Sequence, residues 1–277
     1  MPDEAVHARL HVLLARDDHR AVVIRRGPSK QVATIGWDRR DDSFSVGQWL
    51  KARVYPLRSD LSPDGRHLIL FVYDGRPTDL PGSAVAYTLI SRAPYVKALC
   101  IWTKDDAWHG GGLFIGAKKF WLNDGYGHRK AQGKAPVGRV PAPEYANAYG
   151  GECPGVYFPR LLRDGWVMAD EEPDAEEVTF TKAFAPGWVL VKHFIAGGAR
   201  AAGEGVYRER HELLGPSGRR VRGDDWEWAD VDVKRARVVW AAQGRLVAGR
   251  LGPSGLSEIR VLHEFDDMTF EPLRAPY

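Results

Sequence analysis

A short turn phrase occurs three times in this chain and constrains the fold more than any other feature. It reads LSPDGRH at 61–67, LGPSGRR at 214–220 and LGPSGLS at 251–257. Proline presets the φ angle of the first turn position, and the glycine two residues later accepts a positive φ. The first copy leads directly into the apolar run His67–Tyr73. The phrase therefore predicts a turn that enters a β-strand, used repeatedly.

Short apolar runs fill most of the chain between such turns. The sequence has 30 Gly and 18 Pro, and its 10 Trp, 10 Tyr and 10 Phe greatly outnumber its 3 Met. Aromatic and β-branched residues favour strands, and runs separated by turn residues every 8–12 positions are typical of all-β domains. We therefore expect roughly twenty strands in one domain over residues 1–277. These include Gly155–Phe158 and a last strand at Thr269–Arg274.

The spacing of the turn phrase suggests how the strands are grouped. The last two copies start 37 residues apart, and the first precedes the second by 153 residues, close to four such periods. Propeller blades have four strands and usually occupy about 40–45 residues. The sequence therefore predicts a β-propeller of five to seven four-stranded blades, with six favoured. A closed ring would also hide the edge strands of the individual sheets.

The run Asp60–Phe71, DLSPDGRHLILF, resembles the TolB-type, WD-like β-propeller repeat, in which such a turn links two inner strands of a blade. The chain as a whole resembles a group of uncharacterised bacterial proteins that share the segments IRRGPSK, LSPDG and GGGLF. This resemblance implies a propeller that serves as an interaction platform. It implies no particular reaction, because one fold carries many functions.

Composition excludes several classes of protein. The net charge of +3 gives no strong field for nucleic acid or acidic membranes, and no segment has 18 consecutive apolar residues. Cys100 and Cys153 lie far apart, which argues against a disulfide scaffold and fits a reducing compartment. We expect a cytoplasmic protein without membrane attachment, with nucleic acid an improbable partner. No metal site and no cofactor are expected.

The segment 125–143, GYGHRKAQGKAPVGRVPAP, differs from the rest of the chain. It is rich in Gly and Pro, is basic and has no acidic residue. Such a composition predicts a long exposed loop. Lys130, Lys134 and Arg139 in this loop, together with Arg219–Arg222, could bind phosphate groups. A solvated surface explains these charges equally well.

The string WHGGGLF at 108–114 is the most unusual local motif. Its glycines could let the backbone approach a ligand beside His109, although they do not fit a phosphate-binding loop. Asp124, Tyr126 and His128 alternate and would share one side of an extended segment. With His109 they form a candidate acid–base cluster. The alternative is a Gly-rich turn followed by an exposed loop.

Two hypotheses about function follow. The repeat pattern, the many aromatic residues and the lack of a complete catalytic motif favour a non-enzymatic module that binds a protein partner. The alternative is an enzyme or small-ligand binder with a pocket around the four candidate residues above. Candidate ligand or partner contacts are Trp108, Lys130, Lys134, Trp226 and Trp228. Trp226 and Trp228 could line an exposed patch or pack in the core.

Overall fold

The computed structural model describes residues 6–28, 30–76, 79, 84–169, 176–198, 205–253 and 255–277. Within these residues β-strands predominate, and the one α-helix is α1 (Cys153–Arg163). The expected all-β class is therefore confirmed. No described helix has the length and apolar character needed to cross a bilayer.

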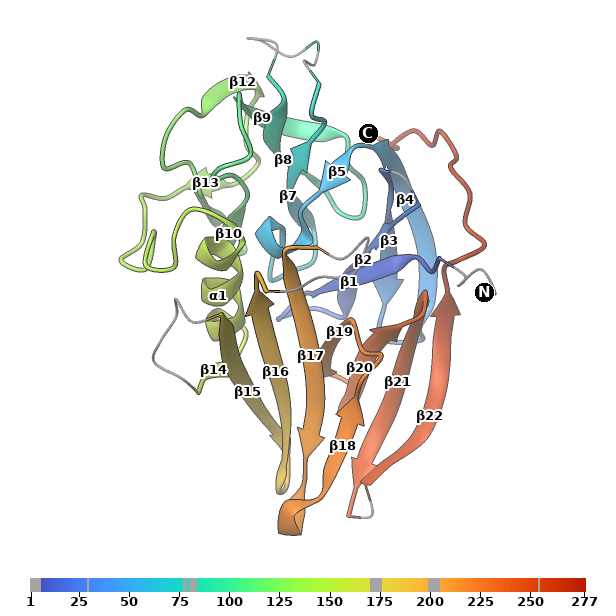
Figure 1. The fold of residues 1–277 in the computed structure, drawn as a ribbon. Coiled ribbons are helices and arrows are strands. Elements are labelled where there is room, and N and C mark those ends of the chain that lie inside the picture. Colours follow the sequence, from blue (N-terminus) through green and yellow to red (C-terminus); the bar gives the residue numbers. More distant parts are fainter. Residues whose placement is uncertain are drawn as a thin grey trace. The chain divides into compact units, whose positions relative to one another are not determined.

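The strands form five sheets (Figure 1), of which sheets A, D and E each occupy one stretch of the chain, whereas sheets B and C interleave in sequence. Sheet A has the order β1 (Arg9–Leu14), β2 (Arg20–Arg26), β3 (Gln31–Asp38), β4 (Ser43–Lys51). Sheet B has the order β12 (Arg129–Gly133), β9 (Ala98–Lys104), β8 (Ala86–Arg92), β7 (His67–Tyr73), β5 (Arg53–Val54), and β6 (Asp60–Leu61) also pairs with β7. Sheet C has the order β10 (Gly112–Gly116), β11 (Lys119–Leu122), β13 (Gly138–Arg139).

The last two sheets contain only antiparallel pairs of strands that are consecutive in sequence. Sheet D has the order β14 (Val167–Met168), β15 (Glu177–Ala185), β16 (Trp188–Ala196), β17 (Tyr207–Leu214), β18 (Arg220–Gly223). Sheet E has the order β19 (Trp228–Asp232), β20 (Arg237–Ala242), β21 (Arg245–Gly252), β22 (Gly255–Glu264). Two short 3₁₀ turns, Pro56–Arg58 and Pro216–Gly218, lie among the described residues.

The chain divides into two compact units. One comprises Leu161–Asp267 with the N-terminal segment as far as His11, and the other comprises Val12–Arg160 with Met268–Tyr277. Sheets B and C belong to the second unit, and sheets D and E to the first. A single domain over the whole chain stays a prediction.

Strand β7 shows why an apolar run need not alternate. Leu68 and Leu70 pack in a core cluster that also contains Ile24 and Leu89, whereas Ile69 packs in a separate cluster with Phe114. Both faces of the strand are therefore covered, and a strand buried on both sides reads as a continuous apolar run.

All three turn phrases form hairpin turns, as the sequence predicts. The first joins β6 to β7, the second joins β17 to β18, and the third joins β21 to β22. Their glycines, Gly65, Gly218 and Gly255, have φ angles of +67°, +75° and +114°. The second and third phrases lead into the last strand of sheets D and E, whereas the first leads out of a short strand at the start of sheet B. The first copy therefore has a different place in its sheet from the other two. Only the spacing of 37 residues, between the second and third copies, compares equivalent positions in two sheets.

Two expected strands are absent. Residues 155–158 belong to helix α1, because a short buried apolar run cannot be assigned to a strand or a helix by its pattern alone. Residues 269–274 form no strand and are held instead by side chains. The side-chain amide of Gln48 donates to the Leu273 carbonyl at 2.9 Å, and Phe270 packs on Trp49 with ring centroids 5.8 Å apart.

The first unit buries an ionic layer. Lys182 contacts Asp230 at 2.8 Å, which joins β15 of sheet D to β19 of sheet E. Lys192 contacts Glu209 at 3.1 Å and the Nε2 atom of His211 at 2.9 Å. Buried charges are tolerated when they are paired and hydrogen-bonded, as these are.

Candidate functional site

A pocket of about 360 Å³ opens in the second unit, where sheets B and C meet the segment after β11. Its lining combines apolar or aromatic side chains with charged ones. The lining residues are Cys100, Trp102, Phe120, Asp124, His128, Lys130, Lys134, Ala135 and Arg139. Four of the residues singled out from the sequence as candidate site residues, Asp124, His128, Lys130 and Lys134, are therefore brought together here.

Strand pairing explains the apolar floor. Cys100 and Trp102 are two residues apart on β9 and so share one face of the strand. Phe120 lies on β11 and packs against Trp102 with ring centroids 5.6 Å apart. Cys100 and Phe120 are fully buried, and Trp102 is 5% exposed. The floor of the pocket thus belongs to the core, and little of its surface is exposed to water.

The segment 125–143 supplies the charged wall. It carries two short strands, β12 and β13, which the expectation of a long exposed loop did not include. β12 pairs antiparallel with β9, which places Lys130 opposite Trp102, and β13 runs parallel to β11, which places Arg139 beside Phe120. Most of the segment is exposed, but Ala135 and Val137 pack against the core cluster of β9 and β11. These apolar contacts hold the segment against the sheets.

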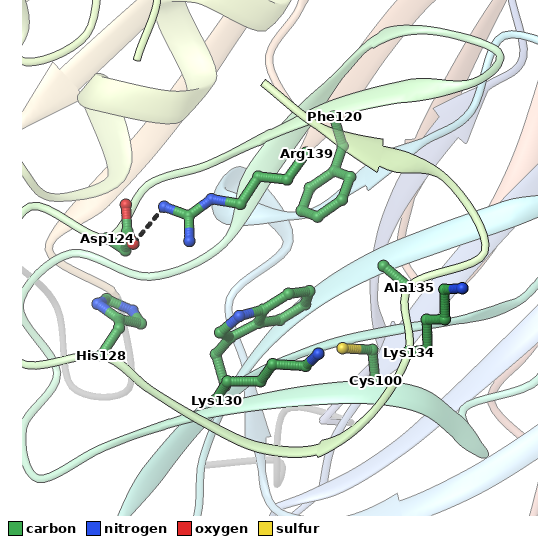
Figure 2. A pocket seen from close by; sticks show the side chains of 9 residues that line it. Cys100, Phe120, Asp124, His128, Lys130, Lys134, Ala135 and Arg139 are labelled. Atoms are coloured by element: carbon green, nitrogen blue, oxygen red, sulfur yellow. Dashed lines mark hydrogen bonds and ion pairs between the residues drawn. The ribbon is translucent and has the colours of Figure 1, made fainter. Parts of the chain in front are cut away.

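Figure 2 shows how the charged side chains lie around the pocket. Arg139 points toward Asp124 and donates a hydrogen bond to its carboxylate. Asp124 and His128 lie on one side of the view, and Lys134 lies on the other beside Cys100. Within the described part of the chain, the side chains of Lys130 and Lys134 make no hydrogen bond or ion pair. Their ammonium groups are therefore available to a ligand.

His128 is uncharged near neutral pH. Burial, followed by the positive charge of Lys104, lowers the pKa of His128 to about 4. Its Nδ1 atom lies 3.2 Å from the Tyr126 carbonyl oxygen, to which a protonated Nδ1 donates. Its Nε2 atom is covered and has no hydrogen-bond partner among the described residues. His128 thus contributes a neutral wall to the pocket.

The other two members of the expected acid–base cluster lie apart from this lining. The rings of His109 and Tyr126 meet edge to face at 5.0 Å, and the ammonium of Lys104 lies 4.3 Å from the centre of the Tyr126 ring. Burial lowers the pKa of His109, with Lys104 as the next contribution. Residues 123–128 bend rather than extend, so the alternation of Asp124, Tyr126 and His128 does not place them on one side.

No hydrogen bond joins the side chains of these four described residues to one another. The acid–base cluster is therefore not assembled. A search of the described residues also finds no group of three His, Cys, Asp or Glu side chains that could hold a metal ion.

The glycines of the WHGGGLF string serve packing instead of ligand approach. A Cβ atom on Gly111 would overlap the backbone of Arg58, and one on Gly110 would overlap the ring of Phe71. Arg58 is buried and donates at 2.6 Å to the carbonyls of Ala107 and His109. The WHGGGLF segment therefore packs against Arg58, a buried arginine of the same unit.

The three tryptophans proposed as contacts lie elsewhere. Trp108 is 56% exposed and does not line the pocket. Trp226 and Trp228 are 6% and 3% exposed, and Trp226 stacks on Trp240 at 4.7 Å. These two indoles pack in the core of the first unit, so the expectation that they line an exposed patch is wrong. Trp228 is the first residue of β19, and Trp226 lies two residues before this strand.

Comparison with known proteins adds no assignment. No protein-family model matches the chain, and no curated protein is similar to it. The resemblance to TolB-type repeats stays a prediction.

Sequence reasoning did not find the floor of the pocket. Cys100, Trp102 and Phe120 belong to ordinary strands, and nothing in their local pattern separates them from other core residues. Arg139 was expected only as a phosphate contact shared with Arg219–Arg222. That second group belongs to the β17–β18 hairpin of the first unit and does not line the pocket.

Proposed function

We propose that this protein binds a small organic anion in the pocket between β9, β11, β12 and β13. The observation that carries the proposal is that Lys130, Lys134 and Arg139 all line one pocket, together with the apolar side chains of its floor. Binding sites for small molecules are concave, largely apolar and fitted with a few polar groups, with volumes of about 300–1,000 Å³. The pocket has these properties.

The lining favours binding over catalysis. Arg139 is held by Asp124, His128 is neutral, and the expected acid–base partners His109 and Tyr126 pack against Lys104 outside the lining. General acid–base chemistry needs groups within hydrogen-bond reach of the reacting atoms. The pocket offers cationic donors and apolar surface, which hold a ligand without transforming it.

Calorimetric titration with benzoate and phenyl phosphate, and with neutral phenol as reference, tests the proposal. The two anions should bind and phenol should not. The double substitution Lys130→Gln/Lys134→Gln should abolish binding, because it removes both unpaired ammonium groups. Lys118→Gln/Lys234→Gln makes the same charge change at exposed positions outside the pocket and should bind like the unchanged protein. Equal loss in both variants would contradict the assignment.

The propeller architecture and a role in protein binding are a second proposal. Five sheets, three of which have their strands in sequence order, support a ring of blades, and the exposed indole of Trp108 supports a contact surface. Exposed tryptophans are frequent anchors at interfaces. A pull-down with the unchanged chain and with Trp108→Ala tests this role. A stoichiometric partner retained equally by both would remove Trp108 from the proposal, and the absence of any such partner would remove the role.

A further inference from the structure

The balance of charge in the pocket indicates which kind of anion it takes. Three cationic side chains, Lys130, Lys134 and Arg139, face one carboxylate, Asp124, so the lining has an excess of two positive charges. The remaining groups that could titrate stay neutral. His128 has its pKa lowered to about 4, chiefly by burial, and burial raises the pKa of the Cys100 thiol. These two groups therefore add no charge to the lining near neutral pH.

We infer that the ligand is a phosphate monoester, whose dianionic group is attracted by the positive charges of Lys130, Lys134 and Arg139 and whose organic part lies on the apolar side of the pocket. This inference rests on the proposed function of the pocket. A phosphate monoester carries close to two negative charges at neutral pH and three acceptor oxygens. Its charge matches the excess of the lining, whereas a carboxylate or a sulfate ester would neutralise only half of it.

The donors suit a phosphate group. A guanidinium and ammonium groups are the side chains that bind phosphate most strongly, the first through paired N–H donors and the second as point charges. Asp124 accepts from only one nitrogen of Arg139, Nη2. A guanidinium has five N–H donors, so the others remain for phosphate oxygens. The ion pair orients Arg139 without using up its capacity to bind.

The floor explains why an ester is expected rather than free phosphate. Beneath the cations the lining consists of Trp102, Ala135 and the buried Cys100 and Phe120. The apolar body of a ligand is stabilised when it leaves water for such surroundings, and an inorganic anion has no apolar body. The pocket of about 360 Å³ also has room for an organic group. Both features favour an ester with an aromatic or aliphatic body.

Phenyl phosphate and phenyl sulfate separate charge from shape. The two molecules share a ring and a tetrahedral head, but the sulfate remains a monoanion, whereas the phosphate loses its second proton near pH 6. Titrations at pH 7.5 and pH 5.0 should show phenyl phosphate binding about fivefold more tightly at the higher pH. At pH 5.0 the two probes should bind alike. Lys130→Gln should remove the preference at pH 7.5, and Lys118→Gln should leave it unchanged.

The possible failures are distinguishable. If neither probe binds, the proposed function of the pocket is wrong, and this inference with it. If both bind equally at both pH values, the pocket binds organic anions and only the choice of a phosphate monoester is overturned. If inorganic phosphate binds as tightly as phenyl phosphate, the role of the floor is wrong and the ligand is not an ester. Circular dichroism of Lys130→Gln, an exchange at an exposed position, verifies that the variant is folded.

Discussion

The Asp124 carboxylate accepts a hydrogen bond from the Arg139 guanidinium, and both side chains line the same pocket. The two residues are 15 positions apart and lie on either side of β12. Their ion pair thus links the two ends of the segment that carries Lys130 and Lys134 and holds this segment in a fixed arrangement. A second pair, Arg129 with Asp105 at 2.6 Å, is similar but lies outside the pocket.

These two pairs provide a matched test of the site. Arg139→Gln should weaken phenyl phosphate binding about tenfold, because a charge-assisted hydrogen-bond donor is lost. Arg129→Gln should leave binding unchanged. Neither exchange should alter unfolding by more than about 1 kcal/mol, since ion pairs this exposed contribute little. Calorimetric titration and urea denaturation of both variants measure these effects. Equal affinities for the two variants would remove Arg139 from the binding site.

Substitution of Gly111 should be severely destabilising. Its φ of +77° is unfavourable for other residues, and a Cβ atom would overlap the Arg58 carbonyl. Gly111→Ala should therefore lower the free energy of unfolding by about 3 kcal/mol or more. Gly116, in the same strand–turn region, has open space around the Cβ position. Gly116→Ala should change stability by less than about 1 kcal/mol, as measured by urea denaturation. Similar losses in both would show that the WHGGGLF segment is not constrained by packing.

Most strands could be predicted from the sequence, because turn residues and apolar runs are local signals. His67–Tyr73 and Lys119–Leu122 are strands with the expected bounds. The failures occur where tertiary contacts decide. Residues 155–158 are helical within α1, and residues 269–274 form no strand, because the side chains of Gln48 and Trp49 hold them. Neither outcome could be predicted from the local sequence of these residues.

The site was predictable only in its charged part. Polar residues in a Gly-rich segment have few structural roles and are therefore candidates for a site. This reasoning found Lys130, Lys134, Asp124 and His128. The floor depends on which strand pairs with which, and β12 pairs with β9 across the intervening residues 105–128, for which the sequence has no local signal. The bend at residues 123–128 likewise separates Tyr126 from its neighbours, which an assumed extended conformation could not anticipate.

The side chain of Gln48 should join the segment at Val96 and Lys97 to the C-terminal segment. Its Oε1 atom accepts from the backbone N–H groups of Val96 and Lys97 at 3.0 and 2.9 Å, and its Nε2 atom donates to Leu273. Gln48→Ala should cost about 2–3 kcal/mol, because three backbone groups lose their partner. Gln31, whose side chain makes no such bonds, provides the control Gln31→Ala. Hydrogen exchange of the Val96 and Lys97 amides should accelerate only in Gln48→Ala, and unchanged protection would contradict the attachment.

The buried His211 should make stability depend on pH. Burial, and then the charge of Lys192, hold the pKa of His211 well below its usual value. Its Nε2 atom accepts from Lys192 at 2.9 Å, and its Nδ1 atom lies 2.9 Å from the Trp226 carbonyl, so the neutral ring is fully used. In the unfolded chain histidine takes up a proton near pH 6.5. Stability should therefore be full above that pH and fall as the pH decreases, by at most about 1.4 kcal/mol per pH unit from this residue.

The substitution His211→Gln isolates this contribution. Glutamine does not titrate but can accept from Lys192 and donate to the Trp226 carbonyl. The variant should be less stable at pH 7.5, yet its free energy of unfolding should decline less steeply between pH 6.5 and pH 5. His128, whose pKa is lowered to about 4, adds a decline of the same sign in both proteins and so cancels in the comparison. Urea denaturation at half-unit pH steps measures both slopes. Parallel curves would mean that His211 is protonated in the folded protein, and that the contact with Lys192 does not exclude the proton.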